Sequence, residues 1–269
     1  MPRSRPLVVA AALFVLLVAA WAAFPGLFAG GNSLTVNPLA ALAPPLSHGI
    51  LGTDQYGRSV FAELVYGARP ALEVGVLSTL IGGTAGSLIG VAGGYLGGWA
   101  DLLVMRLIDV LLALPGLFLA LIFVAALPPT LTNETLALSV TAMPGFARVL
   151  RGQALQVRSR LFVDAATVTG VRRRTILWRH IIPHCLAPAI VLATLNVGTA
   201  IVIAASLSYL GLGPNSGVLS WGGLISSGQG YIDRDWWISA FPGVVVTLLV
   251  IAISILGDRL RDVMEPSGD

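Results

Sequence analysis

The fold of this chain is organised around residues 151–184, which read RGQALQVRSRLFVDAATVTGVRRRTILWRHIIPH. This polar stretch lies between long apolar segments. It holds seven of the sixteen basic residues in the chain, namely Arg151, Arg158, Arg160, Arg172, Arg173, Arg174 and Arg179. We interpret it as a cytoplasmic loop at which a membrane protein meets a soluble partner.

The composition predicts an integral membrane protein. Of 269 residues, 56% are hydrophobic and only 11% are charged, whereas soluble domains carry about 25% charged residues. Every basic residue is an arginine, and a chain without lysine has neither a P-loop nor a Schiff-base lysine. We therefore expect the chain not to be an enzyme, and not to be an ATPase by itself. The single cysteine, Cys185, excludes an intrachain disulfide.

Hydropathy predicts six membrane-spanning helices, because each apolar run approaches or exceeds the roughly 20 residues that cross a bilayer. These runs are residues 7–24, 72–96, 102–127, 134–150, 186–210 and 238–256. Arginines precede the first run and follow the last, so we expect both termini in the cytoplasm. A cleaved signal peptide is the alternative for 7–24, and we favour a retained anchor because further spans follow.

The predicted spans suggest two parts. Residues 1–71 form an N-terminal anchor helix and an outer, periplasmic loop, and residues 72–269 form a core of five spans with the polar loop 151–184 inside it. In the outer loop, residues 59–67 suit a short amphipathic helix on the membrane surface. We expect Arg58 and Glu63 to be solvated there.

Glycines recur every fourth residue along the second span, at Gly82, Gly86, Gly90, Gly94 and Gly98. Residues four apart lie on one helix face, so these glycines predict a groove in which another helix packs closely. A nucleotide-binding glycine loop is the alternative, but no G-x-G-x-x-G pattern occurs.

The third span carries Arg106 and Asp109, which are spaced to pair on one helix face, and Pro115, which predicts a kink. In the fourth span Pro144 and Gly145 predict an interruption. Broken helices at membrane depth tend to line a pathway. We therefore take three residues as candidates for a translocation pathway, namely Thr141, Pro144 and Phe146.

Gly170 divides the polar loop into two helical segments, 161–169 and 171–182, with the second expected to end near Pro183. Helices this short are unstable alone in water, so they need a partner surface. His180 and His184 are four apart and suggest a metal site as an alternative, which Pro183 between them and the absence of H-E-x-x-H disfavour.

The loop carries a recognisable motif. Asp164-Ala165-Ala166, three further residues, Gly170, nine further residues and His180-Ile181-Ile182-Pro183 resemble the EAA motif of binding-protein-dependent ABC importer permeases. The resemblance implies the type I ABC importer transmembrane fold. It also implies that Asp164, Ala165, Ala166, Gly170 and Pro183 belong to a coupling helix that inserts into a cytoplasmic ATPase. The chain departs from the family pattern with Asp164 in place of the usual Glu and His180 in place of a frequent Ile.

Further stretches resemble the C-type permease subunit of dipeptide, oligopeptide and nickel importers. They are HGILGTDQYGRS at 48–59, Gly67-Ala68-Arg69, GGYLGGWAD at 93–101, LSYLGLG at 207–213, Ser220-Trp221-Gly222, Phe241-Pro242-Gly243 and LGDRLRDVMEP at 256–266. The resemblance implies a multi-pass subunit of the bacterial inner membrane that translocates di- or oligopeptides, with nickel and glutathione as alternatives.

The resemblance also implies the partners. They are a second, similar permease, two ABC ATPases that bind ATP and Mg²⁺, and an extracytoplasmic binding protein, with no cofactor in this chain. An ion-coupled transporter is an alternative function. It would need carboxylates deep in its spans, and only Asp109 is a candidate. An intramembrane enzyme would need a catalytic constellation at mid-membrane depth, and the histidines are not there.

Overall fold

The computed structural model describes residues 5–30, 34–214 and 217–264, and within them the chain is helical with no named strand. The elements are α1 Arg5–Ala23, α2 Pro25–Phe28, η2 Pro38–Ala40, α3 Val60–Leu96, α4 Gly98–Ala113, α5 Gly116–Ala126, α6 Leu131–Arg158, α7 Leu161–Val168, α8 Arg173–Ile176, η3 Leu177–Ile181, α9 Ile182–Tyr209, α10 Trp221–Gly228, η4 Gln229–Tyr231 and α11 Trp237–Met264. The all-α prediction is confirmed.

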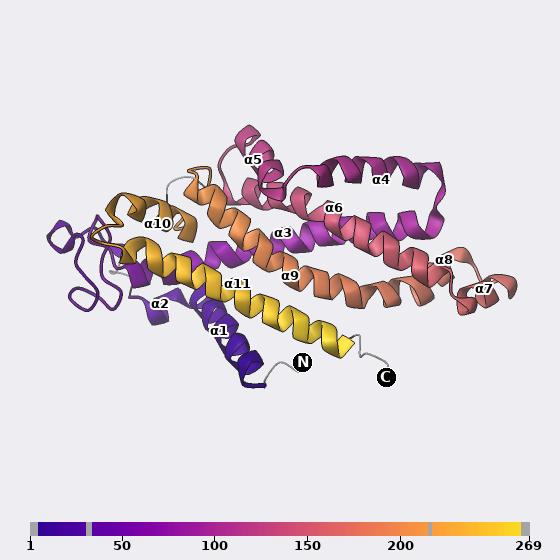
Figure 1. Ribbon diagram of the computed structural model, residues 1–269, viewed down its shortest axis with the longest axis horizontal. Helices are drawn as coiled ribbons and strands as arrows, with labels where there is room; N and C mark the ends of the chain where they lie inside the picture. The colour runs from indigo at the N-terminus through magenta and orange to yellow at the C-terminus, as the bar shows by residue number, and fades with distance from the viewer. Residues whose placement is uncertain (1–4, 31–33, 215–216, 265–269) are drawn as a thin grey trace.

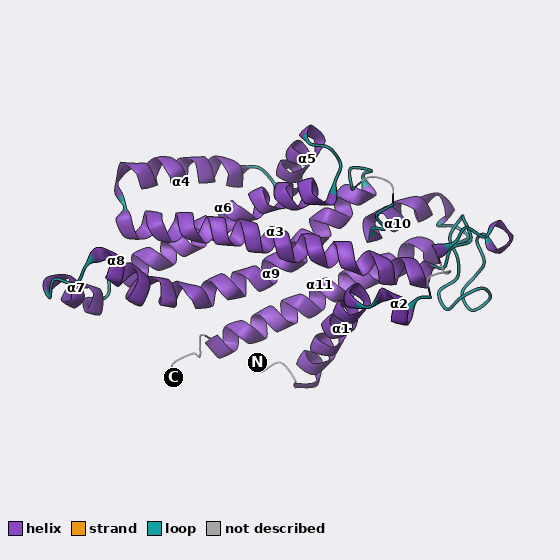
Figure 2. Cartoon of the chain, turned by 180° about the vertical axis from the view of Figure 1, so that it is seen from behind, coloured by secondary structure: helices purple, strands orange, loops and turns teal. Residues whose placement is uncertain are grey.

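The long helices form an elongated bundle in which successive helices alternate in direction (Figure 1). Figure 2 shows the same bundle from behind. One end carries α7 and α8, and the other carries α10 and the loop before α3. We call these the α7 end and the α10 end. Helix α3 packs most extensively against α6, and α9 packs against α3, α6 and α11.

Every predicted span has a counterpart among these helices. In the described residues, α1, α3, the continuous stretch Arg173–Tyr209 and α11 are long and apolar enough to cross a membrane. Helices α4 and α5 would make a fifth, bent span. Helix α6 is 28 residues long but more polar, and it packs against α3, α4, α5 and α9. Helix α6 does not qualify as a span by its own apolarity, and it corresponds to the predicted fourth span by its length and its place among the other helices.

The expected kink at Pro115 is confirmed. Helices α4 and α5 meet at 95° around a break at Leu114 and Pro115. Leu114 is extended, with φ −89° and ψ 136°, because the ring of the following proline disfavours the helical conformation in the residue before it.

The prediction of a separate surface helix at residues 59–67 is wrong, since these residues form the N-cap and first turns of α3. The Ser59 side chain accepts a hydrogen bond from the backbone N–H of Ala62 at 3.4 Å and so caps the helix. Val60, Val65 and other apolar residues of these turns are buried. Burial of this face holds the helix together through Pro70, which lies inside it.

The predicted interruption at Pro144 is also wrong, because α6 runs without a break from Leu131 to Arg158 and contains Pro144. Proline removes one backbone hydrogen bond and crowds the carbonyl four residues earlier. Close packing of the next turn on α3 outweighs this local cost, since Phe146 and Ala147 are both buried.

Pro183 does not end the second segment of the polar loop. It lies in the first turn of α9, directly after the π-helical turn η3, and the helix runs on to Tyr209. Proline is tolerated in the first turn of a helix, where its fixed φ suits the helical conformation, so α9 continues past Pro183.

Candidate functional site

The motif residues 164–183 lie at the α7 end, where the chain leaves α6 and returns into α9 (Figure 1). Helix α7 begins after Arg160 and is separated from α6 by Ser159 and Arg160 only. The segment is therefore a short helix held between the ends of two long ones. Two residues join α7 to α6, and α8 and η3 lie between α7 and α9.

Gly170 ends α7 with a backbone conformation that suits glycine. Its φ is +77°, in the left-handed region that other residues rarely adopt. The N–H of Val171 donates to the carbonyl of Ala166, and the N–H of Gly170 donates to that of Thr167. These two bonds form a Schellman motif, which satisfies the last carbonyls of α7. The motif glycine thus fixes the turn between α7 and α8.

Helix α7 has one buried side chain and one exposed face. Val163 is 4% exposed and packs in a cluster with Val157, Ile176 and Ile181. The opposite face is exposed and has the i, i+3, i+4, i+7 spacing of one helix side. It consists of Leu161, Asp164, Ala165 and Val168. Leu161 and Val168 are 85% and 88% exposed, so this face is an apolar surface with one carboxylate in its middle.

Aromatic contacts attach α7 to α9. The Phe162 ring stacks on His184, with ring centroids 5.6 Å apart, and also contacts His180 at 5.9 Å. The His184 Nδ1 lies 2.7 Å from the His180 carbonyl oxygen. The two histidines therefore pack against an aromatic ring. In the described residues no group of three or more His, Cys, Asp or Glu side chains is placed to hold a metal ion.

A hydrogen bond attaches the loop to α3. The Tyr95 hydroxyl donates to the carbonyl of Arg173 at 3.0 Å. The sequence prediction missed both Tyr95 and Phe162. Tyr95 lies in the GGYLGGWAD stretch, and Phe162 is an aromatic residue within the polar loop. The sequence around Tyr95 and Phe162 does not indicate which residues they contact.

Four of the five glycines in the predicted row lie against α6. A Cβ added at Gly82, Gly86 or Gly90 would lie 2.2–2.3 Å from the backbone carbonyl oxygens of Ser139, Met143 or Ala147. At Gly94 the carbonyl of Arg151 would be 2.7 Å away. Both helices repeat with a four-residue period along this contact, so their backbones approach closely over several turns.

Gly98 is not part of this row, and its assignment to helix packing is wrong. Helix α3 ends at Leu96, and Gly98 begins α4 with φ +87°. A Cβ at Gly98 would meet no atom within 4 Å. Gly98 serves the sharp turn between α3 and α4 instead.

Ion pairs join α4 to α6. Arg151 donates to both carboxylate oxygens of Asp101, at 2.8 and 2.6 Å. Asp109 pairs with Arg148 of α6, so the expected pair between Arg106 and Asp109 is wrong. A long-range partner on a packed helix has replaced the local one. The bidentate geometry at Asp101 fixes the start of α4 beside α6.

The three pathway candidates lie on the unbroken helix α6. Pro144 is buried and Phe146 is 2% exposed, with the Phe146 ring facing Gly83 of α3. Thr141 is half-buried and its hydroxyl donates to the Leu138 carbonyl. The premise of a broken helix is wrong, and Pro144 and Phe146 pack inside this chain.

At the α10 end, the LGTD stretch forms a buried ion cluster. The backbone N–H groups of Tyr56 and Arg58 donate to Asp54 Oδ1, and the Arg58 guanidinium donates to Oδ2. Arg58 Nη2 also lies 2.7 Å from Glu63 Oε1. Asp54 and Glu63 are both 0% exposed, so the expected solvated pair is wrong. The cluster ties the outer loop to α3.

The indole of Trp237 extends this connection to α11. Its Nε1 donates to the carbonyl of Thr53 at 3.1 Å, and Trp237 is buried. On the other side of α3, Trp221 Nε1 donates to the Leu64 carbonyl at 2.9 Å. Trp237 thus joins the loop before α3 to α11, and Trp221 joins the first turns of α3 to α10.

Comparison with known proteins identifies the class. Residues 82–267 match the family described as binding-protein-dependent transport system inner membrane component. The match covers most of the chain, and the chain belongs to this family. It is a permease subunit of an ABC importer, a multi-pass protein of the inner membrane, with the all-α transmembrane fold of type I importers.

Individual relatives extend the match over the whole chain. The probable D,D-dipeptide transport system permease protein DdpC of Escherichia coli K12 is 35% identical over 266 residues, which are 99% of this chain and 89% of that protein. The dipeptide transport system permease protein DppC of Alkalihalophilus pseudofirmus is 37% identical, with 91% and 81% covered. The glutathione transport system permease protein GsiD of Pectobacterium atrosepticum is 35% identical, with 96% and 86% covered. The resemblance to peptide importer permeases is confirmed.

Proposed function

We propose that this chain translocates dipeptides or oligopeptides as one of two permease subunits of its importer. An extracytoplasmic binding protein delivers the peptide, and two separate ATPase subunits bind ATP and Mg²⁺ and drive transport. The chain contains no lysine and hence no P-loop, which agrees with ATP hydrolysis outside it.

The exposed face of α7 is the observation that carries the coupling role. It presents Leu161, Asp164, Ala165 and Val168 outward, while Val163, Phe162 and the Gly170 turn hold the helix to the bundle. An exposed apolar surface on a firmly held helix suits a docking site. Asp164, Ala165, Ala166, Gly170 and Pro183 belong to this coupling segment. Because α7 is attached to α6 and α9, and because the following helix α8 is attached to α3 through Tyr95, displacement of this segment moves the spans.

The proposed orientation follows the arginines. Seven of them lie in residues 151–184, so the α7 end faces the cytoplasm and both termini lie on that side. The α10 end then faces the binding protein. The division into an N-terminal part, residues 1–71, and a core, residues 72–269, stays a prediction, as does the pathway role of Thr141.

The names of the relatives support a peptide substrate, because several are dipeptide or peptide permeases. One relative is a glutathione permease, and glutathione is the second candidate. Both candidates are small peptides. Nickel, the remaining alternative, has no support among these relatives.

The test is uptake by the complete importer in proteoliposomes. The complex of both permeases and both ATPases is reconstituted with its binding protein, and labelled alanyl-alanine or glutathione is supplied outside. We expect uptake that requires ATP, Mg²⁺ and the binding protein. Uptake driven by a proton gradient without the ATPases would instead show an ion-coupled transporter.

The coupling segment is tested in the same preparation. In Asp164→Ala we expect uptake to fall while the assembled permease pair remains. Full uptake and full stimulation of ATP hydrolysis in this variant would show that Asp164 has no part in coupling.

A further inference from the structure

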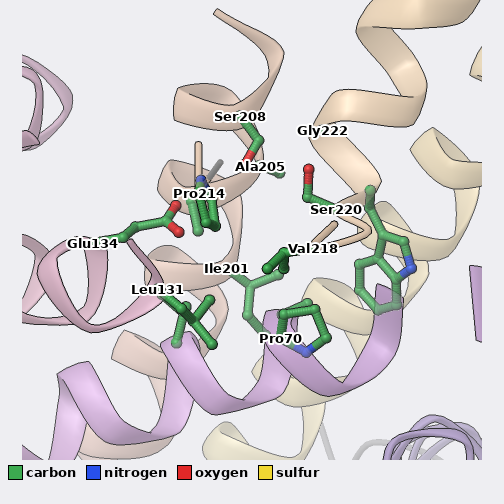
Figure 3. A pocket seen from close by; sticks show the side chains of 14 residues that line it. Pro70, Leu131, Glu134, Ile201, Ala205, Ser208, Pro214, Val218, Ser220 and Gly222 are labelled. Carbon is green, nitrogen blue, oxygen red and sulfur yellow. The ribbon is translucent and has the colours of Figure 1, made fainter. Parts of the chain in front are cut away.

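A small cavity lies near the α10 end, between helices that meet from distant parts of the chain (Figure 3). Its walls come from α3, α6, α9 and the segment that leads into α10. The labelled lining includes Pro70, Leu131, Ile201, Ala205 and Val218. The cavity measures about 30 Å³, which is room for one or two water-sized groups.

Glu134 is the only titratable residue that lines this cavity in the described part of the chain. It lies in the first turn of α6 and is 4% exposed. Its carboxylate points from α6 into the cavity, toward side chains of α9 and of the segment before α10 (Figure 3). Its Oε1 atom accepts no hydrogen bond from any described residue. No arginine lines the cavity, so no basic side chain there neutralises the carboxylate.

A buried carboxylate without a partner is costly. The carboxylate oxygens of Glu63 also make no hydrogen bond in the described residues, but Asp54 and Glu63 each have a cation, because they share Arg58. Ionisable residues inside membrane bundles are rare and usually serve a function. Glu134 therefore differs from the structural acids near it, because its carboxyl group faces an open space and not an internal cation.

The lining selects the kind of cation. Ca²⁺ and Mg²⁺ take six or more oxygen ligands, and zinc, copper and nickel favour histidine or cysteine ligands, while this cavity offers one carboxylate, the hydroxyls of Ser208 and Ser220, and mostly apolar walls. A primary ammonium carries three N–H donors and is the size of a water molecule. It can donate one hydrogen bond to a carboxylate and another to a hydroxyl, and the carbon atoms beside its nitrogen suit apolar walls such as Ile201.

We infer that this cavity binds a primary ammonium group and that Glu134 is its counter-ion. The inference rests on the proposed function, because the free amino terminus of a peptide is such a group. The cavity then takes the leading end of a peptide on the outer side of the permease. The substrates selected here are compounds with a free amino terminus.

The test measures binding to the assembled importer in nanodiscs without its binding protein, so that selection by the permease is seen alone. Tritiated alanyl-alanine is the probe, and ethylammonium, N-acetyl-alanyl-alanine, tetramethylammonium and potassium are competitors. We expect ethylammonium to displace the probe, and the other three to displace it poorly. In Glu134→Gln the affinity for the probe falls about tenfold or more, since a charged hydrogen bond is lost.

Glu73→Gln is the matched control, because Glu73 is a half-exposed carboxylate on α3 that already pairs with Arg69. The complex with Glu73→Gln should bind the probe with the same affinity as the unmodified complex. The thermal stability of the empty complex gives a second readout. Glu134→Gln should leave it unchanged or raise it, because an unpaired buried charge is removed. A lower stability with unchanged probe affinity would show a structural role and overturn the inference.

The remaining outcomes are also decisive. Equal competition by N-acetyl-alanyl-alanine, by potassium or by tetramethylammonium would overturn the ammonium assignment, as would wild-type complex that binds no probe. If Glu134→Gln does not assemble, the competition series on the unmodified complex decides by itself. ATP-driven peptide uptake is measured in parallel. If uptake persists and the affinity for the probe does not depend on Glu134, this inference alone is wrong. If no uptake occurs, the proposed function is wrong.

Discussion

The Phe162 ring of α7 stacks on the imidazole of His184 in α9, with ring centroids 5.6 Å apart and planes at 25°. This contact joins the short exposed helix to a 28-residue helix that crosses the bundle. Helices α7 and α9 are therefore connected through packed rings as well as through the chain.

Removing this contact should weaken coupling. Stacked aromatic pairs contribute about 0.5–1.5 kcal/mol beyond the area they bury, so in Phe162→Ala we expect the ATP hydrolysed per peptide imported to rise by about 2- to 12-fold. The measurement is the ratio of ATPase rate to uptake rate in proteoliposomes. Phe118→Ala is the control, since Phe118 is exposed on α5. An unchanged ratio in Phe162→Ala would show that the stack transmits nothing.

A large side chain on the exposed face of α7 should block docking. Ala165 is exposed, so Ala165→Trp should leave the stability of the permease unchanged while the two ATPases no longer co-purify with it. Val263→Trp adds bulk at an exposed site near the end of α11 and should retain the ATPases. Normal ATPase recovery with Ala165→Trp would place the docking surface elsewhere.

The contact between α3 and α6 makes a prediction about stability. A methyl group at Gly90 would lie 2.3 Å from the Ala147 carbonyl oxygen, so Gly90→Ala must separate two helix backbones. We expect a loss of about 1–3 kcal/mol, measured by denaturant-induced unfolding in detergent. At Gly145 the space beside the added methyl is open. Gly145→Ala should therefore keep or raise stability, and an equal loss in both variants would contradict the close contact.

The buried ion cluster at the α10 end, formed by Asp54, Arg58 and Glu63, makes a second prediction about stability. Arg58→Met leaves Asp54 and Glu63 without their shared cation, and both are 0% exposed. Breaking a buried ion pair on one side costs about 3–5 kcal/mol. Unfolding in detergent should show this loss, and Glu63→Gln added to Arg58→Met should restore part of it.

Arg69→Met is the matched control for that experiment. The Arg69 side chain is 67% exposed and pairs with Glu73 four residues away. Exposed pairs of this kind contribute little, so we expect no measurable change. Loss of stability in Arg69→Met and not in Arg58→Met would reverse our assignment of the two pairs.

Local patterns in the sequence predicted much of the fold. Apolar runs located the six long helices or helix pairs, and Pro115 located the break between α4 and α5. The four-residue glycine period located the face of α3 that meets α6. The spacing of Ala166, Gly170 and Val171 is also local, and it places the turn that ends α7. Each of these features depends on residues near one another in the chain.

Contacts between distant residues decided the rest. Proline has a local cost in a helix, and the sequence therefore predicted an interruption at Pro144 and an end near Pro183. Helix α6 continues past Pro144 because it packs on α3, and α9 continues past Pro183 because this proline lies in its first turn. Asp109 has Arg106 close in sequence but pairs with Arg148, because α4 lies beside α6.

By itself, the sequence determined the class of protein, its long apolar helices and the position of the motif segment 164–183, since hydropathy and motif spacing are properties of neighbouring residues. Only the tertiary structure decided that Glu63 is buried with a cation and Glu134 is buried beside a cavity. Both are single acids near the start of a helix. Their difference arises from which distant helices close over each carboxylate and whether those helices supply an arginine.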